Sequence, residues 1–267
     1  MTSVLSYGNQ VVTIDAGELI SFLVNEVEVI HQKGDPGWGS SDTEMFPVIG
    51  PTTQVKYQIP TPLGVAKQDQ HGILRELRYT CILKQDHIAT FEKTYTAETA
   101  ILNSKYPLKS DQKWLSWPYD FTFTKTFVLG KNGLTVSFEI KAPIGMPFML
   151  GYHPAFKLYG DSAQINANNY NVSLQEVLDA GASAYVLKNA TAIHVKSSYD
   201  LELTTKGFPH MMLWSPTTNM MCVEPITWYP YAIPQQPILN GFNTIKTETT
   251  AFSVHLKVTA NKPNPNT

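Results

Sequence analysis

Two short motifs each place an ionisable side chain directly before a proline. In GYHPAF, His153 ends an apolar run and precedes Pro154. In MMCVEPIT, Glu224 ends a second apolar run and precedes Pro225. An imidazole has a reference pKa of about 6.5 and a glutamate carboxyl one of about 4.3, which burial raises. Such a pair suits general acid–base catalysis, which needs pKa values near the working pH.

The two prolines indicate how these side chains are held. Proline donates no N–H to a sheet, and it pushes the residue before it toward extended geometry. We therefore expect His153 and Glu224 at the ends of two strands, and we predict that both side chains reach one pocket. Taken singly, each has a plain structural explanation, as a hydrogen-bonded histidine near the core or a solvated glutamate at a rim. The repeated construction favours the functional interpretation.

The segment QDQHGILREL holds a third group of candidates. His71 and Arg75 could both donate hydrogen bonds to a polyol ligand. Gly72 permits a close approach of the backbone or a positive φ. The alternative is a surface turn that carries an ion pair between Arg75 and Glu76. Both interpretations stay open on this segment alone.

Other chemistries find little support. The seven histidines show no H-x-x-x-H or H-x-H spacing, so we expect no metal site. The sequence has no G-x-S-x-G motif and no phosphate-binding or dinucleotide-binding glycine pattern, which disfavours nucleophilic and cofactor-dependent enzymes. Cys81 and Cys222 lie among apolar residues, and we expect free, buried thiols. Acid–base chemistry without a cofactor is the class that the residues favour.

The composition indicates a sheet-rich globular protein. The chain has 267 residues, of which 43% are hydrophobic and only 16% charged. The net charge is −2 and no Lys/Arg block occurs, so we expect neither a nucleic-acid partner nor a membrane partner. No apolar run approaches the ~20 residues that span a bilayer, and the N-terminus does not resemble a signal peptide. We expect a cytoplasmic protein, either a monomer or a homodimer.

The elements that must hold the candidate residues are short strands. Period-two alternation dominates, GKNG at 130–133 predicts a hairpin turn, and one short helix is expected around Leu174–Leu178. This pattern predicts an all-β fold, either a barrel or a large antiparallel β-sandwich with few short helices. We expect one domain over residues 1–267, with loops at 32–42 and 227–241 and a disordered tail at 261–267. The predicted strands are Val12–Ile14, Leu19–Leu23, Val27–Val29, Tyr79–Leu83, Ala89–Thr96, Phe121–Leu129, Leu134–Ile140, Phe148–Tyr152, Ala192–Val195, Leu201–Thr204, Met211–Trp214, Met220–Glu224 and Ala251–Val258.

Segments in a fixed order resemble the aldose 1-epimerases, or galactose mutarotases. They are MFPVIGPT (45–52), QHGILREL (70–77), WPYDFTFTKTFVL (117–129), MPFMLGYHPAF (146–156), and MLWSP with MCVEP (212–216 and 221–225). The compact bacterial branch of that family carries FP-I-I-G, HG-x-x-R, YPF-x-F, G-x-HP-x-F and C-x-EP in this order. The resemblance extends from about residue 11 to 258. Each motif is short, so their common order carries the signal.

The resemblance implies a galactose mutarotase-like β-sandwich with a cleft across one sheet. It also implies interconversion of the α and β anomers of a free aldose, without a metal or cofactor. By the same resemblance, an ionised Glu224 is the base and a protonated His153 is the acid. His71 and Arg75 are implied to bind the sugar. Trp214 is implied to line the cleft, with a place in the core as the alternative.

The sequence departs from this branch at one informative position. An arginine commonly follows FP-I-I-G there, whereas Pro51 stands in that place here. A basic group for a substrate hydroxyl or phosphate is therefore missing. Two alternatives stay open. One is a hexose-6-phosphate mutarotase or epimerase whose phosphate pocket comes from Arg75, Arg78, Lys56 and Lys67. The other is a non-catalytic carbohydrate-binding protein of the same fold.

Overall fold

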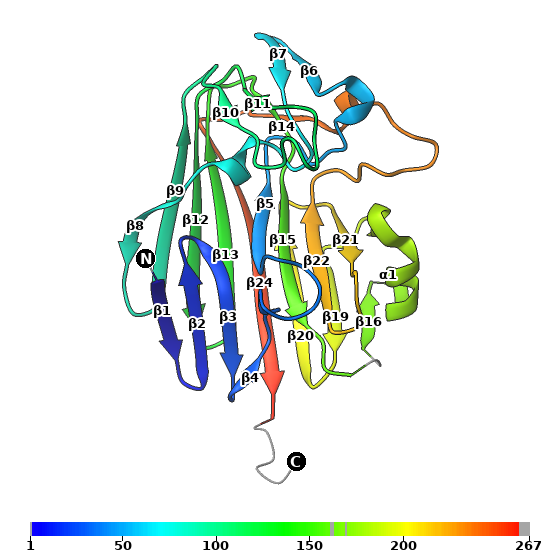
Figure 1. Ribbon diagram of the computed structural model, residues 1–267. Helices are drawn as coiled ribbons and strands as arrows, with labels where there is room; N and C mark the ends of the chain where they lie inside the picture. Colours follow the sequence, from blue (N-terminus) through cyan, green and yellow to red (C-terminus); the bar gives the residue numbers. More distant parts are fainter. Residues whose placement is uncertain (1, 161–162, 169, 262–267) are drawn as a thin grey trace.

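The computed structural model describes residues 2–160, 163–168 and 170–261, and Figure 1 shows them as layers of strands. A nine-stranded sheet forms one layer, and a five-stranded and a four-stranded sheet pack on it. All pairings between the named strands in these ranges are antiparallel. The predicted antiparallel β-sandwich is confirmed. Residues 262–267 of the expected disordered tail lie outside the described residues, and the single domain stays a prediction.

The nine-stranded sheet is built around its three longest strands, which lie side by side in its middle. From edge to edge, the strands are β17 (Tyr170–Ser173), β16 (Gln164–Ala167), β19 (Ala192–Lys196), β20 (Tyr199–Lys206), β24 (Thr249–Ala260), β13 (Gly133–Lys141), β12 (Phe121–Gly130), β9 (Ile88–Tyr95) and β8 (Thr80–Lys84). The predicted hairpin joins β12 to β13, with Gly130 paired to Gly133.

The five-stranded sheet carries both proline motifs. From edge to edge, its strands are β18 (Tyr185–Leu187), β21 (His210–Trp214), β22 (Met220–Ile226), β15 (Gly151–Lys157) and β5 (Asp42–Met45). It faces the nine-stranded sheet, because the rings of Tyr152 on β15 and Phe138 on β13 have centroids 4.9 Å apart. Segments far apart in the sequence therefore lie side by side in this sheet (Figure 1).

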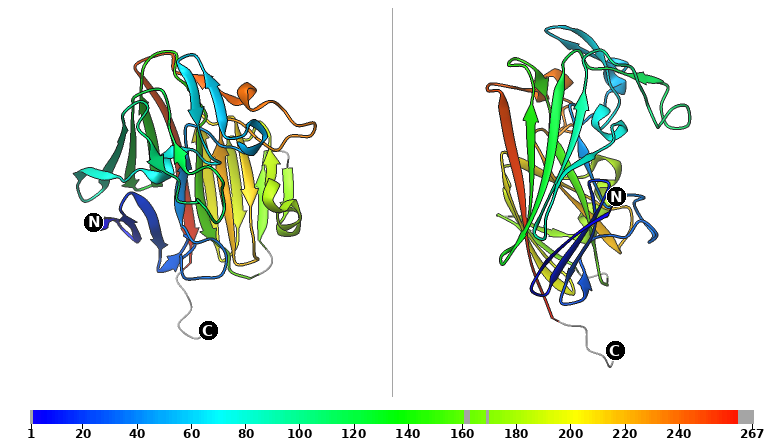
Figure 2. Two further views of the ribbon diagram at one scale, coloured as in Figure 1. Left: turned by 45° about the horizontal axis from the view of Figure 1, so that its top comes forward. Right: turned by 90° about the vertical axis from the view of Figure 1, so that its left-hand side faces the viewer.

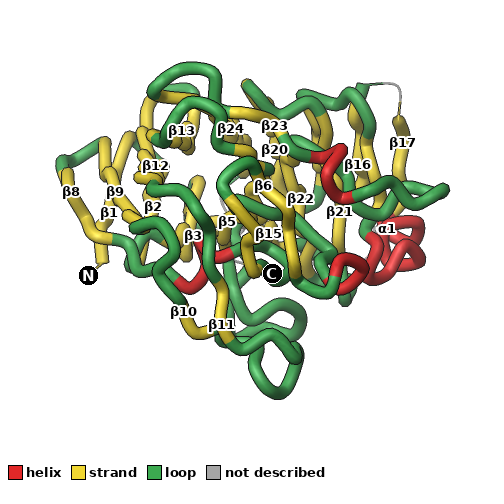
Figure 3. Tube along the Cα trace, turned by 90° about the horizontal axis from the view of Figure 1, so that it is seen from above, coloured by secondary structure: helices red, strands yellow, loops and turns green. Residues whose placement is uncertain are grey.

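Smaller sheets complete the sandwich. The N-terminal sheet contains β1 (Thr2–Tyr7), β2 (Gln10–Asp15), β3 (Glu18–Val24) and β4 (Val27–Glu28). Three two-stranded pairs are β6 (Gln58–Thr61) with β7 (Gly64–Lys67), β10 (Ile101–Leu102) with β11 (Trp114–Leu115), and β14 (Pro147–Phe148) with β23 (Asn243–Thr244). The β6–β7 hairpin lies at one end of the sandwich, and the C-terminal end of β24 lies at the other (Figures 1 and 2). Seen from that end, loops and the short pairs lie over the ends of the longer strands (Figure 3).

Helical structure is sparse, as predicted. The α-helix α1 (Leu174–Ala180) begins at a capping box, in which Ser173 and Glu176 each satisfy a backbone N–H of the other. The short 3-10 helices are η1 (Thr53–Val55), η2 (Ile73–Glu76), η3 (Gly181–Ser183) and η4 (Ile238–Gly241). Within the described ranges, no helix combines the length and the apolar character needed to cross a membrane.

The core lies between the sheets and follows the period-two pattern of the strands. In β12, alternate residues point inward and are buried, among them Phe121, Phe123 and Phe127. Lys125 shares this inward face and is also fully buried, although its side chain is charged and the others are apolar. One hydrophobic cluster reaches from the N-terminal sheet to β24.

Two expectations about the strands are wrong. The predicted strand over 148–152 is divided between β14 and β15. In addition, β15 and β22 continue through their prolines, so His153 and Glu224 lie inside strands and not at strand ends. A proline fits within a strand where the ladder can lack one N–H. The named pairs between β15 and β22 are interrupted across residues 152–154 of β15, which accommodates Pro154.

Candidate active site

Strand pairing brings the two motifs together on the five-stranded sheet. Ala155 pairs with Cys222, and the same antiparallel register places His153 opposite Glu224. Side chains opposite each other in an antiparallel pair project from the same face. The distance between His153 Nε2 and Glu224 Oε1 is 3.3 Å. The two ionisable groups are therefore direct neighbours, although 70 residues of chain lie between them.

The third strand of this face is β21. Met212 pairs with Glu224 and Trp214 pairs with Cys222, so both side chains project beside the carboxylate. Together with His153, these residues line a pocket of about 240 Å³. Pockets for drug-sized ligands enclose ~300–1,000 Å³, so this one suits a small molecule. Trp214 is half-buried and lines the pocket, as the resemblance implied.

A strained turn forms one wall of the pocket. His71 has φ of 76° and Gly72 has φ of 73°. A Cβ atom on Gly72 would lie 2.2 Å from the carbonyl oxygen of Phe46, so only glycine fits there. Both properties that the sequence predicted for Gly72, close approach and positive φ, are present. The turn leads into η2, and His71 and Arg75 line the pocket.

Backbone carbonyls hold these two side chains in place. Arg75 Nε donates a hydrogen bond to Glu44 O at 2.9 Å, and His71 Nδ1 lies 3.2 Å from Ile49 O. Three buried atoms of the site nevertheless lack a hydrogen-bond partner among the described residues. They are His153 Nδ1, Glu224 Oε2 and Arg75 Nη2. Because buried polar atoms are almost always paired in proteins, a ligand rich in hydroxyl groups would complete this site.

The sequence analysis did not assign six lining residues to the pocket, among them Trp38, Gln70 and Tyr231. The ring of Trp38 lies over the imidazole of His153, with centroids 4.2 Å apart and planes inclined by 31°. Gln70 Nε2 donates a hydrogen bond to Tyr231 Oη at 2.8 Å. Trp38 and Tyr231 belong to the two loops expected at 32–42 and 227–241. An aromatic residue within a Gly- or Pro-rich loop is the sequence feature that could have indicated these two pocket residues.

Burial controls the protonation of the central pair. His153 is 6% exposed and Glu224 is 1% exposed. Burial raises the pKa of Glu224 to about 8, although the charge of Arg75 lowers it. Burial, reinforced by Arg75, lowers the pKa of His153 well below its usual value. At neutral pH the pair holds one proton, on Glu224. This differs from the implied ionised Glu224 and protonated His153, because removing two charges from water is unfavourable.

Arg75 supplies the positive charge of the pocket. Burial lowers its pKa to about 10, and Glu224 opposes this shift, so the guanidinium stays protonated at neutral pH. Burial lowers the pKa of His71 well below its usual value, and Arg75 and His153 add to the effect. His71 is therefore neutral and can both donate and accept hydrogen bonds. Among the described lining residues, Arg75 is the one permanent cation.

Cys222 lies close enough to the pair to form a potential metal-ligand group. Its sulfur and the ligand atoms of His153 and Glu224 all lie within 4.8 Å of one another. Burial raises the pKa of the Cys222 thiol well above its usual value, and Glu224 adds to this, so a metal would have to displace the thiol proton. Both cysteines are free, but Cys81, on the edge strand β8, is half-buried, which corrects the expectation of two buried thiols.

The basic residues considered for a phosphate pocket do not gather at this site. Arg75 lines it, whereas Arg78 lines a second pocket that also contains Arg75. Lys56 and Lys67 are exposed and line neither pocket. The four residues therefore do not form one phosphate-binding group.

The fold is that of the galactose mutarotase-like proteins. A galactose mutarotase-like protein from Lactobacillus casei ATCC 334 is 19% identical and aligns over 97% of this chain and 100% of its own, with a TM-score of 0.75. A galactose mutarotase related enzyme from Lactobacillus acidophilus is 18% identical over 98% of this chain and 99% of its own, with a TM-score of 0.73. An aldose epimerase homologue from C. elegans is 10% identical over 98% and 99% of the two chains, with a TM-score of 0.68.

The family of the chain is shown by a match of its sequence to a family profile. The profile of the family described as "Aldose 1-epimerase" matches residues 50–255, which is most of the chain. The chain therefore belongs to the aldose 1-epimerase family, as its motifs predicted. A search of curated proteins gave no significant match.

Proposed function

We propose that the protein is an aldose 1-epimerase, a mutarotase that interconverts the α and β anomers of a free aldose. The observation that carries this proposal is the 3.3 Å contact between His153 Nε2 and Glu224 Oε1 inside a pocket. Ring opening needs one group that takes a proton from the C1 hydroxyl and another that gives a proton to the ring oxygen. Membership of the family supports the same class of reaction.

In this mechanism Glu224 is the base and His153 is the acid. The proton that rests on Glu224 first passes to His153 across their contact. Arg75 lowers the pKa of Glu224, which helps it release the proton, and it also lowers the pKa of His153, which makes protonated His153 a stronger acid toward the ring oxygen. His153 then protonates the ring oxygen while Glu224 removes the C1 hydroxyl proton, and the C1–O5 bond opens to the aldehyde. Rotation about C1–C2 presents the other carbonyl face, and the ring closes with the two roles reversed.

The remaining pocket residues hold the sugar. Neutral His71 and the unpaired Nη2 of Arg75 bind hydroxyl groups, and Trp38 and Trp214 offer apolar faces to the C–H surface of the ring. A general acid and a general base contribute ~10²–10⁴-fold each. Because free sugars already anomerise in water, this contribution accounts for the activity without a cofactor.

Saturation-exchange NMR of the anomeric protons, over a panel of free and phosphorylated aldoses, tests the proposal. We expect the protein to accelerate exchange for at least one free aldose. Glu224→Gln and His153→Asn should each lower the catalysed rate by ~10²-fold or more, because each removes a proton-transfer group. Glu139→Gln, at an exposed position on β13, is the matched control and should be unchanged. An undiminished rate in Glu224→Gln would refute the assignment, and sugar binding without acceleration would indicate a carbohydrate-binding protein instead.

One observation favours a hexose-6-phosphate mutarotase as a second candidate. A hollow of about 270 Å³ shares Gln70 with the sugar pocket, and Pro51, Lys105 and Lys109 line it. These lysines stand near the position where the family's arginine is replaced by proline. If this candidate is correct, phosphorylated aldoses will be preferred in the panel and Lys109→Gln will raise their KM. A preference for free aldoses that Lys109→Gln leaves unaltered would exclude it.

A further inference from the structure

Both arginines of the chain line one pocket that the proposed mechanism does not use. The sequence contains 20 basic residues, of which only Arg75 and Arg78 are arginine. The pocket has a volume of about 400 Å³, larger than the sugar pocket, and it lies beside the edge strand β5. Arginine is the residue best suited to bind phosphate, because its planar donors match two oxygens at once. The placement of both arginines therefore raises the question of an anionic ligand.

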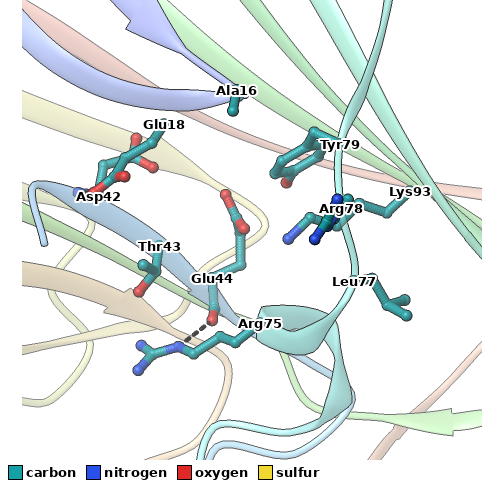
Figure 4. Close-up of a pocket in the computed structure, with 11 residues that line it drawn as sticks. Ala16, Glu18, Asp42, Thr43, Glu44, Arg75, Leu77, Arg78, Tyr79 and Lys93 are labelled. Carbon is teal, nitrogen blue, oxygen red and sulfur yellow. Dashed lines mark hydrogen bonds between the residues drawn. The ribbon is translucent and has the colours of Figure 1, made fainter. Parts of the chain in front are cut away.

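The donors of this pocket gather on one side. In Figure 4, Arg78, Tyr79 and Lys93 line one side of the pocket, and Glu44 of β5 lines the other. Lys93 Nζ lies 4.1 Å from the centroid of the Tyr79 ring and donates one hydrogen bond, to Leu74 O at 2.8 Å. An ammonium group has three N–H donors, so two remain available. Arg78 is exposed and forms no hydrogen bond or ion pair with any described residue.

The acidic residues of the pocket are already occupied by other groups. Glu44 forms an ion pair with Lys125 at 2.6 Å, and Asp42 contacts the same ammonium group. Asp42 also accepts a hydrogen bond of 2.5 Å from the hydroxyl of Tyr152.

The third acid, Glu18, lies at the rim of this pocket. It accepts the N–H of Ser41 at 2.8 Å and forms an ion pair with Lys33. Among the described residues, no carboxylate lies within ion-pair distance of Arg75 or Arg78.

Neither Arg78 nor Lys93 is therefore in ion-pair contact with a carboxylate of the described residues, although Glu44 lies near enough to act on Lys93. Burial lowers the pKa of Lys93 to about 8, even though Glu44 opposes the shift, as expected for an ammonium group that lacks a close counterion. Arg78 and Lys93 together can offer several N–H donors to a tetrahedral anion.

We propose that this pocket binds a phosphate group between the guanidinium of Arg78 and the ammonium group of Lys93. The guanidinium contacts two phosphate oxygens, and Lys93 contributes its two free N–H donors. The site is separate from the acid–base pair, since neither His153 nor Glu224 lines it. The group could belong to inorganic phosphate or to a small phosphate monoester.

Isothermal titration calorimetry with inorganic phosphate on the intact protein tests this site. We expect binding to the wild type, and Arg78→Gln should weaken it about tenfold or more, because it removes a charge-assisted bidentate contact. Arg78 is exposed, so this variant should fold. Lys67→Gln removes one charge from an exposed position outside the pocket, and Lys109→Gln removes one beside the sugar pocket. Both should leave the affinity within about twofold.

The outcomes separate this site from the proposed enzyme activity. Glu224→Gln should bind phosphate as well as the wild type does, whether or not the protein is a mutarotase. Glycerol phosphate that binds more tightly than inorganic phosphate would identify a monoester as the ligand, and weaker binding would identify the free ion. The proposal fails if the wild type does not bind millimolar phosphate. It also fails if Lys67→Gln weakens binding as much as Arg78→Gln, or if only Lys109→Gln weakens it.

Discussion

At the scale of single residues, the proposed chemistry depends on one proton shared by two buried groups. Burial favours the neutral forms of both Glu224 and His153, and their contact allows the proton to move between them. The two arrangements of that proton have the same net charge. The pH dependence of the reaction therefore reports the pair and not either residue alone. Arg75 is the nearby charge that determines how easily Glu224 ionises.

Replacement of Arg75 tests this electrostatic role. In Arg75→Gln the pKa of Glu224 should rise further above about 8, because the one charge that lowers it is lost. A neighbouring charge typically changes a carboxyl pKa by ~1–3 units, so the alkaline decline of kcat/KM should move up by about one unit. The measurement is a pH series of anomer exchange. Arg78→Gln, the other arginine, should leave the profile in place, and an unmoved profile in Arg75→Gln would contradict the role.

At the scale of elements, the sequence indicated residues that line one pocket but not how strands hold them. Apolar runs that end in His153 and Glu224 identified both residues correctly as neighbours of a pocket. The prolines suggested strand ends, yet β15 and β22 run through them, because the ladder between the two strands is interrupted locally. Local preferences of proline could not reveal this, since the interruption depends on the pairing partner. The edge strand β5 was missed because DTEM carries two acids.

The acids of β5 are buried because Lys125 reaches them from the opposite sheet. Lys125→Met should remove this ion pair and leave Asp42 and Glu44 buried without a cation at contact distance. Breaking a buried pair in this way costs ~3–5 kcal/mol of unfolding free energy. Urea denaturation measures the loss. Because the carbonyl of Glu44 accepts the hydrogen bond from Arg75, anomer exchange should fall as well.

An exposed ion pair provides the control for this variant. Lys257 lies 3.3 Å from Glu202, and both side chains are exposed. Lys257→Met should cost less than ~1 kcal/mol, because water screens such a pair. Equal losses of stability in the two variants would show that the Lys125 bridge between the sheets has no special importance.

At the scale of the whole molecule, the site is a product of long-range assembly. Three strands form its floor, and its walls come from the segment around His71 and from loops that carry Trp38 and Tyr231. The sandwich, its hairpin and its helix could be predicted, because period-two alternation and turn residues are local signals. The loop aromatics could not be assigned to the pocket, since nothing local specifies where a loop packs. The motif order, read as a family resemblance, supplied what local patterns lacked.

Burial of Glu224 should also be visible in the stability of the whole fold. Its folded pKa of about 8 lies above its ordinary value of 4.5, so between about pH 4.5 and 8 the folded state keeps a proton that the unfolded state has lost. The stabilising contribution of this proton is therefore lost as pH rises through that window. Relative to Glu224→Gln, the wild type should lose up to about 1.4 kcal/mol of unfolding free energy per pH unit. Parallel curves from urea denaturation of the two proteins would disprove the raised pKa.

The pH profile of kcat/KM for anomer exchange tests the shared proton most directly. The account predicts a maximum near neutrality and a decline above about pH 8, where the pair loses its single proton from Glu224. It predicts a second decline on the acid side, below the usual range of histidine, where the pair takes up a second proton. A rate that stays flat from about pH 5 to about pH 9 would contradict the account.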